Sequence, residues 1–525
     1  MKQPDHLFEL IKSLSISEKR YFKLLSGKHV VGDENNYIKI FNAVDAHVSK
    51  NRYDEKAIIS KFAQEKFIKH FAFHKNYLYN LLLDSLHVYH MNLGTDARLQ
   101  KQLHQAAVLF QKGLFKQCKT LLDKTKREAL EMERYQYLFE AIVIEKKLIK
   151  GTSFANVTEA ELLQLHLEGK LALSQTKNVD EYLDLQDHLI YLFNKSGEVR
   201  SKHQKKKYDS IMRNPLLKSE KKALSLTGKR IFNNIHTIYS FSAGNNFQTA
   251  FKYVSRCLEL LEAAPAIIKE DPNVYIAILT NFLSTCSQYN HFVHTEKAIE
   301  KMRSIAGTYK LKLSSSLQMK IFTNSALFEL NMYAGRGEFE KINSLIGSIE
   351  TDLTIFNGKI NPAAERTLQY NIACMYFGAR NYKKTIEWLN KILKVGEADT
   401  KQDIVCFSKI LQFMTHLELD NTDFLSYIVK STENFLDKRN RIHKGETIVL
   451  NFVKKFQRID SQKELMDLYS RTRMAFVKIE NLPLEKNFFR YFDFLSWVNS
   501  KIERKTFMEL VKNKYKESLK KQENN

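Results

Sequence analysis

Two pairs of histidines near the start of the chain have the spacing of metal ligands on a helix. His70 and His74 are four residues apart and His87 and His90 are three apart, so each pair would share a helix face. Imidazole is a common zinc ligand, and a catalytic zinc needs three protein ligands around an open position. The HExxH pattern of zinc hydrolases is incomplete because Phe71, not glutamate, follows His70. Aromatic residues surround both pairs, and we therefore expect structural packing or surface exposure rather than a metal.

A row of carboxylates is the second pattern with the geometry of a reactive site. Asp180, Asp184 and Asp187 recur at helical spacing, and His188 follows them. Such a row can hold a divalent metal when other helices supply further ligands, but a solvated helix face has the same pattern. The sequence contains no GxGxxG, GxxxxGK[ST] or GxSxG motif. We therefore expect no catalytic site, no metal and no cofactor.

Basic residues concentrate in one segment of a chain that is itself strongly basic. The formal net charge is +23, and residues 195–230 hold twelve Lys or Arg against three Asp or Glu. Several cations on one face can neutralise the phosphates of a nucleic acid, or bind an acidic protein, with strong salt dependence and little sequence readout. An exposed linker that keeps the protein soluble would have the same composition. The polyanion-binding candidates are Arg200, Lys202, Lys205, Lys206, Lys207 and Arg213.

The elements that must position these residues are predicted to be helices. Six prolines and 17 glycines are few for 525 residues, and both residue types disfavour helix interiors. No segment alternates apolar and polar residues with the period of two that half-buried strands require. Asn214-Pro215, Asp271-Pro272 and Asn361-Pro362 each place a capping residue before a proline, which favours a helix start. The fold class is therefore predicted to be all-α.

A helix-hairpin pattern recurs about every 44 residues from Phe115 to Phe424. In each copy an aromatic residue follows a turn-like residue, and small or apolar residues stand three, seven and ten positions later. The regular copies are Phe115-Cys118-Leu122-Thr125, Phe247-Ala250-Val254-Cys257, Phe292-Thr295-Ile299-Met302, Phe339-Ile342-Ile346-Ile349 and Tyr382-Thr385-Leu389-Ile392. Less regular copies are expected around Glu159–Ala172 and Tyr182–Phe193. A fixed period of this kind predicts stacked units that bury their apolar faces against their neighbours.

Several of these copies resemble the tetratricopeptide repeat (TPR). The matching positions are Gly113, Phe115, Cys118 and Leu122 in one copy, Gly337 and Phe339 in another, and Ala373, Tyr376, Tyr382 and Leu389 in a third. The chain departs from the family in its period, which is nearer to about 44 than to about 34. Asn245, Asn290 and Arg380 also stand where the family has glycine.

The resemblance implies a right-handed α-solenoid whose concave groove binds a protein or peptide, with a HEAT-like or other helical array as the alternative. Asparagines in such grooves can hold a peptide backbone, whereas side chains that merely face water are the simpler interpretation. The lysines of a carboxylate clamp are not identifiable at matching positions. The groove-binding candidates are His236, Tyr239, Asn324, Asn331, Tyr370 and Asn371.

Three regions are predicted along the chain. Residues 1–97 form an N-terminal helical bundle or cap, residues 98–441 the repeat array, and residues 442–525 a C-terminal helical cap with a basic tail that we expect to fray. Ser15 and Glu18 have the spacing of a capping box before the helix that ends at Gly27, and further helices are expected at 37–48, 55–67 and 73–90. The first block can cap the array or can read nucleic acid through a helix-turn-helix. The combined architecture also resembles the peptide-sensing Rap-type regulators of bacteria, by analogy alone.

Cysteine usage and hydropathy point to the compartment. The five cysteines are scattered without a CxxC pair, which is typical of a reducing environment. No signal peptide and no apolar run of membrane-spanning length are recognisable. We therefore expect a cytoplasmic, non-enzymatic scaffold that binds a protein or peptide. The alternative is a nucleic-acid-associated or peptide-responsive regulator that uses residues 195–230 and the N-terminal block.

Overall fold

The computed structural model describes residues 5–27, 36–48, 53–91, 94–155, 157–196, 199, 202–244, 246–288, 291–394, 402–437, 443–459, 461–482, 485 and 488–523. Every regular element in these residues is a helix, and none is a strand. The predicted all-α class is therefore confirmed for the part of the chain that is described. Contacts group the chain into two compact units, residues 1–176 and 177–525. The predicted divisions at residues 97 and 441 stay predictions.

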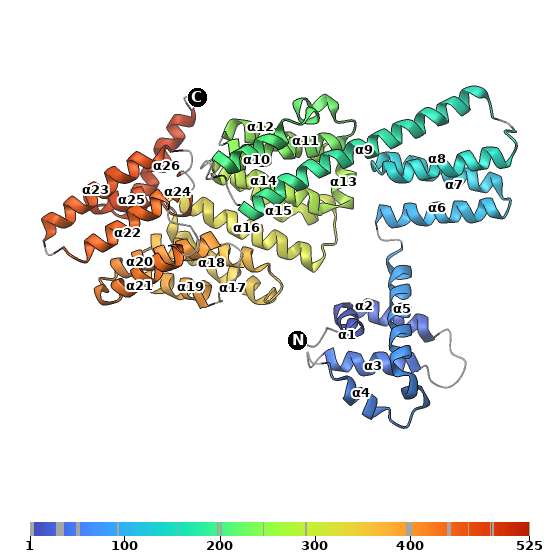
Figure 1. Ribbon diagram of the computed structural model, residues 1–525, viewed down its shortest axis with the longest axis horizontal. Helices are drawn as coiled ribbons and strands as arrows, with labels where there is room; N and C mark the ends of the chain where they lie inside the picture. Colours follow the sequence, from blue (N-terminus) through green and yellow to red (C-terminus); the bar gives the residue numbers. More distant parts are fainter. Residues whose placement is uncertain are drawn as a thin grey trace. The chain divides into compact units, whose positions relative to one another are not determined.

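The first unit begins with short helices that enclose a core of their own (Figure 1). They are α1 (His6–Ser13), α2 (Ile16–Gly27), α3 (Asn36–Val48), α4 (Glu55–Lys61), the 3-10 helix η1 (Lys66–His70) and α5 (Phe71–His90). The predicted capping box is confirmed, since the Ser15 amide donates to Glu18 Oε2 at 2.6 Å and the Glu18 amide donates to Ser15 Oγ at 3.3 Å. The helix expected over 55–67 is divided between α4 and η1.

Helix α5 is less buried than its richness in aromatic and aliphatic residues suggests. Phe71, Leu78 and Leu82 form its buried side. On other sides of the helix, Phe73 is 66% exposed and Tyr77 is 46% exposed. These two aromatic residues therefore lie outside the buried side of α5.

The rest of the first unit contains three packed helices and the first part of a fourth. These are α6 (Thr95–Gln111), α7 (Phe115–Glu131), α8 (Tyr135–Gly151) and α9 (Glu159–Ser196), and the boundary between the two units falls within α9. Helix α9 is continuous where two irregular hairpins were expected, so that expectation is wrong. Its sequence contains no proline, and Gly169 packs against Ile142 and Lys146 of α8, so no turn forms.

The second unit is built mainly from pairs of antiparallel helices, each of which contacts the next pair (Figure 1). It opens with α10 (Lys202–Met212), the 3-10 helices η2 (Pro215–Lys218) and η3 (Glu220–Lys222), α11 (Leu226–Tyr239) and the π-helical turn η4 (Ser240–Gly244). It continues with α12 (Phe247–Glu262), α13 (Pro265–Glu270), α14 (Pro272–Gln288), α15 (Val293–Tyr309), α16 (Ser315–Arg336), η5 (Phe339–Lys341), α17 (Ile342–Ile355), α18 (Pro362–Gly378), α19 (Tyr382–Lys394), α20 (Gln402–Glu418) and α21 (Thr422–Asp437). The pairs are α11 with α12, α14 with α15, α16 with α17, α18 with α19, and α20 with α21.

The three helix starts that were expected before prolines are confirmed. The side chains of Asn214, Asp271 and Asn361 accept hydrogen bonds from backbone amides two residues later, at 2.9, 3.1 and 2.9 Å. These bonds satisfy amides that have no partner within the helix, and proline loses nothing at this position because its missing N–H would be unpaired.

The aligned aromatic residues mark the start of the second helix of a pair. Phe115, Phe247 and Tyr382 are the first residues of α7, α12 and α19, Phe292 immediately precedes α15, and Phe339 begins η5. Each residue three, seven or ten positions later is buried, except Ile346, which is half-buried. The register taken from the sequence is therefore confirmed.

Three of these rings, those of Phe247, Phe292 and Phe339, pack at the end of the first helix of the following pair. A Cβ atom placed on Gly335 would overlap the ring of Phe292, and one on Gly378 would overlap the ring of Phe339. Phe247 instead stacks on His291, just after α14, with ring centroids 4.0 Å apart. These contacts join helix pairs about 40 residues apart, and we call them the ring contacts.

The turn before the aromatic residue uses the left-handed backbone conformation. Gly113 and Gly337 have φ of 73°. Arg380 takes the same conformation with φ of 60°, although it stands at a position where the family has glycine. Asn245 and Asn290, at the corresponding positions of other copies, lie outside the described residues.

The C-terminal helices pack onto the last pairs. They are α22 (Lys444–Phe456), α23 (Gln462–Glu480), α24 (Phe488–Tyr491), α25 (Phe494–Glu503) and α26 (Phe507–Glu523). The tail that was expected to fray is helical as far as Glu523. The ring of Tyr515 in α26 contacts the ring of Phe292, with centroids 5.8 Å apart. The ring of Phe507 stacks on that of Phe339, with centroids 5.4 Å apart. The apolar residues of α26 thus hold it as a packed helix, although its composition is rich in lysine.

Because of the ring contacts, we expect replacement of Gly378 by alanine to destabilise the protein, which is the opposite of the usual effect of this replacement in a helix. Alanine is the better helix former by about 1 kcal/mol, so an exposed helical glycine should gain stability on replacement. At Gly378 the new methyl group meets the buried ring of Phe339, and overpacking of this kind costs about 1–3 kcal/mol. We expect Gly378→Ala to lower the unfolding free energy in urea. Gly347→Ala in α17, where a Cβ atom has open space, should raise it. A stabilised Gly378→Ala variant would contradict the role given to this contact.

Candidate functional site

The histidine pairs do not converge in the structure. His70, His87 and His90 are exposed, while His74 lies among aromatic rings. His90 Nε2 lies 2.7 Å from Glu18 Oε1. No group of three or more His, Cys, Asp or Glu side chains that suits a metal ion occurs among the described residues.

The acidic row on α9 is exposed to solvent. Asp180, Asp184, Asp187 and His188 are all exposed. No described ion pair joins any of them to the basic segment that follows. The row is therefore a hydrated helix face, and its charges remain available.

Two groove candidates on α11 contact the segment just before that helix. The Tyr239 hydroxyl donates to Asp209 Oδ1 of α10 at 2.7 Å. His236 Nε2 lies 3.0 Å from the Leu217 carbonyl oxygen of η2, and its ring stacks on Tyr253 with centroids 4.4 Å apart. Burial lowers the pKa of His236, although its bond to Leu217 acts in the opposite direction. Both side chains therefore hold α10 and η2 against α11.

The asparagine candidates bind one another across neighbouring helices. Asn371 Nδ2 of α18 donates to Asn331 Oδ1 of α16 at 2.6 Å, and Asn324 Nδ2 of α16 donates to Thr280 Oγ1 of α14 at 3.0 Å. The same kind of bond continues toward the N-terminus, from Asn281 of α14 to Asn234 of α11 at 2.7 Å and from Asn234 to Gln186 of α9 at 2.9 Å. We call this series the amide ladder.

Sequence reasoning missed the amide ladder, although its spacing was visible. Gln186, Asn234 and Asn281 are 48 and 47 residues apart, which is close to the repeat period. The remaining groove candidate, Tyr370, is 2% exposed, and its hydroxyl donates to the Tyr491 carbonyl oxygen at 3.0 Å. Tyr370 therefore presents no surface to a partner, and the candidate amides are engaged within the protein.

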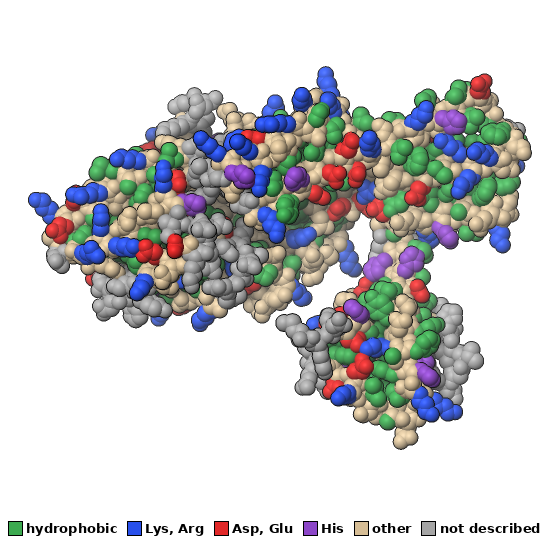
Figure 2. Space-filling view, viewed as in Figure 1, with side chains coloured by type: hydrophobic (Ala, Val, Ile, Leu, Met, Phe, Trp, Pro, Cys, Tyr) green, Lys and Arg blue, Asp and Glu red, His purple; other side chains and the backbone are tan. Residues whose placement is uncertain are grey.

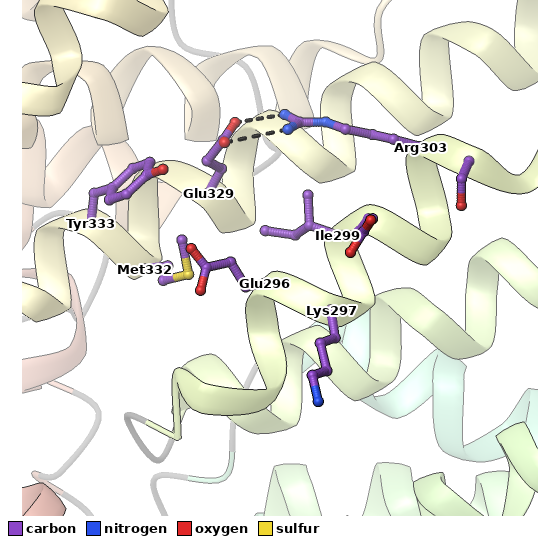
Figure 3. A pocket seen from close by; sticks show the side chains of 9 residues that line it. Glu296, Lys297, Ile299, Arg303, Glu329, Met332 and Tyr333 are labelled. Atoms are coloured by element: carbon purple, nitrogen blue, oxygen red, sulfur yellow. Dashed lines mark hydrogen bonds and ion pairs between the residues drawn. The ribbon is translucent and has the colours of Figure 1, made fainter.

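A hollow of about 640 Å³ lies between α15 and α16 (Figure 3). Ile299 and Met332 are buried beneath it. Arg303 and Glu329 are joined across the two helices by two hydrogen bonds of 2.6 and 3.3 Å, so their charges neutralise each other. We call this feature, with its lining residues Glu296, Lys297, Ile299, Glu300, Arg303, Ser304, Glu329, Met332 and Tyr333, the α15–α16 hollow.

The charges that remain in the α15–α16 hollow are mainly negative. Glu296 and Glu300 are exposed, and Glu296 makes only a long contact of 3.4 Å with Arg336. Figure 3 shows the Lys297 side chain turned away from Glu329 and Tyr333. Burial and the nearby carboxylates raise the pKa of Tyr333, so its phenol stays neutral. An acidic, partly apolar hollow is thus present on a strongly basic protein.

The basic segment is helical and mostly exposed. Lys202, Lys206, Lys207 and Arg213 are exposed and form no ion pair with any described residue. Lys205 differs, because its ammonium group lies 3.1 Å from Asp209. Figure 2 shows Lys and Arg side chains gathered over α10 and the segment that follows it. The remaining candidate, Arg200, lies outside the described residues.

Comparisons with known proteins do not assign the chain to a family. No protein-family model, curated protein or solved structure matches it. Within the described helices, no stretch is both long enough and apolar enough to span a bilayer.

Burial of His236 predicts a loss of stability in mild acid. Because its pKa in the folded protein lies below the ordinary value of 6.5, the unfolded chain binds the proton more readily. The contribution of His236 to the unfolding free energy is fully present above pH 6.5. It declines as the pH falls below this value, by at most about 1.4 kcal/mol per pH unit. His236→Phe should reduce the slope of the unfolding free energy between pH 7.5 and 5.5. An equal slope in the His236→Phe variant and in the wild type would contradict the assignment.

Proposed function

We propose that the helix pairs between α11 and α21 form a right-handed TPR-like α-solenoid and that the protein is a non-enzymatic scaffold for a protein or peptide partner. Three features support the solenoid: each helix pair contacts the next, the ring contacts recur at the repeat period, and the amide ladder links the first helices of successive pairs. The five free cysteines, four of them buried, favour a reducing compartment, and we propose the cytoplasm.

The α15–α16 hollow is the observation that carries the proposed binding function. Its buried floor of Ile299 and Met332 suits the aliphatic stem of a lysine or arginine. The neutral Tyr333 ring and the carboxylates of Glu296 and Glu300 suit the cationic head of the same side chain. The hollow therefore favours a partner that inserts a basic side chain. Helices α15 and α16 pack directly on each other, so the site is preformed and little ordering is required on binding.

A charge-reversal pull-down tests this function. The full-length tagged protein is incubated with nuclease-treated extract of the cells that produce it, and retained proteins are quantified by mass spectrometry. We expect E296K/E300K to reduce retention of the specific partner at least about tenfold, which corresponds to about 1.4 kcal/mol. The reversed charges would repel the cationic head, whereas the side chains of Glu296 and Glu300 are exposed and take no part in the buried floor of the hollow.

The acidic row on α9 supplies a matched control. Asp180 and Asp184 are exposed and have the same four-residue spacing as Glu296 and Glu300. D180K/D184K therefore changes the net charge by the same amount at a different place. If both double variants retain the same proteins as the wild type, or both lose them, the hollow is not the docking site.

A further inference from the structure

Apart from Lys205, the cations of α10 and of the two short helices that follow it form no ion pair among the described residues. Residues 202–222 contain only two acidic residues, Asp209 and Glu220. Asp209 is bound by Lys205 and Tyr239, and Glu220 accepts from Asn233 at 2.7 Å and lies 3.6 Å from Arg256. Asp209 also interacts electrostatically with Arg213, but neither acid forms an ion pair with any other described cation of this segment. The remaining cations of the segment are exposed and without an ion pair among the described residues, and we call them together the basic face: Lys202, Lys206, Lys207, Arg213, Lys218, Lys221 and Lys222.

The basic face is held in a fixed position by the opposite side of α10. Tyr208 is 1% exposed and Ile211 is 5% exposed, so this side of the helix is anchored in the core. The chain of bonds from Lys205 through Asp209 to Tyr239 ties the helix to α11. Lys202 and Lys206, four residues apart, therefore project from one side of a helix that cannot rotate freely. Fixed cations lose less conformational freedom on binding than those of a flexible linker.

The chemistry of the basic face favours phosphates over a protein surface. None of the strongly exposed large apolar side chains falls within residues 202–222. A protein interface usually has an apolar or aromatic centre, whereas the exposed large apolar side chain that follows this segment is a single one, Leu224. Binding of single-stranded nucleic acid relies on aromatic stacking, and the one aromatic residue of this segment, Tyr208, is buried. A duplex backbone requires only a series of cations, and the sequence pI of about 9.4 suits such a ligand.

We propose that the basic face binds the phosphate backbone of double-stranded nucleic acid without reading its sequence. This activity is separate from the scaffold function, because it uses a different surface from the α15–α16 hollow. Cations that contact phosphates release condensed counter-ions, so binding weakens steeply as salt is added. No base-edge contact is involved, and duplexes of different sequence bind with equal affinity.

Fluorescence anisotropy with the full-length protein tests the proposal. The probes are two labelled 25-base-pair duplexes of unrelated sequence, titrated at several salt concentrations. We expect K202Q/K206Q/R213Q to weaken binding at least tenfold in 0.1 M salt. The slope of log affinity against log salt should become shallower by up to about 2.7, or about 0.9 for each lost phosphate contact. A second variant, K218Q/K221Q/K222Q, should weaken binding in the same direction.

The matched control removes three cations elsewhere in the same unit. Lys463, Arg473 and Lys478 of α23 are exposed and have no described ion pair. K463Q/R473Q/K478Q should change the affinity less than twofold. Equal weakening by this variant would show that net charge alone is responsible, and the proposal would be wrong. It would also be wrong if the wild type failed to bind either duplex in low salt, if it preferred one sequence, or if poly-glutamate displaced the duplex at equal charge concentration.

Discussion

The ring contacts are the constraint on which the rest of the second unit depends. An aromatic ring at the start of one helix occupies the space that a side chain would fill at the end of a helix in the next pair. Gly335 and Gly378 provide this space for Phe292 and Phe339. Each contact fixes the distance between two successive pairs, and it also brings the preceding turn to a defined place. Residues three, seven and ten positions after the ring then face the interior because the helix has 3.6 residues per turn. In the pairs that have a ring contact, this single contact thus constrains both the spacing of the pairs and the rotation of the helix that carries the ring.

The sequence predicted those properties of the fold that depend on neighbouring residues. The helical periodicity placed the buried faces, and the prolines after Asn214, Asp271 and Asn361 marked three helix starts. Properties that depend on distant residues were not predictable. Gly378 is an ordinary helical glycine until Phe339, some 39 residues earlier, is known to lie against it. The exposure of Phe73 and the packing of α26 on α16 depend on tertiary contacts in the same way.

For the candidate sites too, features that depend on neighbouring residues were predictable from the sequence, and features that depend on distant residues were not. The exposed cations of α10 followed from composition and helical spacing. The groove-binding role of the candidates stays a prediction, because an asparagine that faces a groove and one that binds a neighbouring helix look alike in a sequence. Asn324, Asn331 and Asn371 are committed to the amide ladder. The α15–α16 hollow was not predicted at all, since its lining comes from two helices and neither contribution is unusual alone.

The amide ladder also determines how the second unit would respond to a pulling force. Every rung joins one helix only to the helix of an adjacent pair, as Asn281 joins Asn234 and Asn371 joins Asn331. A load applied along the ladder passes from pair to pair through these rungs and through the buried apolar contacts between the same helices. Hydrogen bonds are short-ranged and yield after a small displacement. Stretching would therefore open one junction at a time while the remaining pairs stay intact, and the unit would lengthen in steps as a compliant spring rather than rupture as one body.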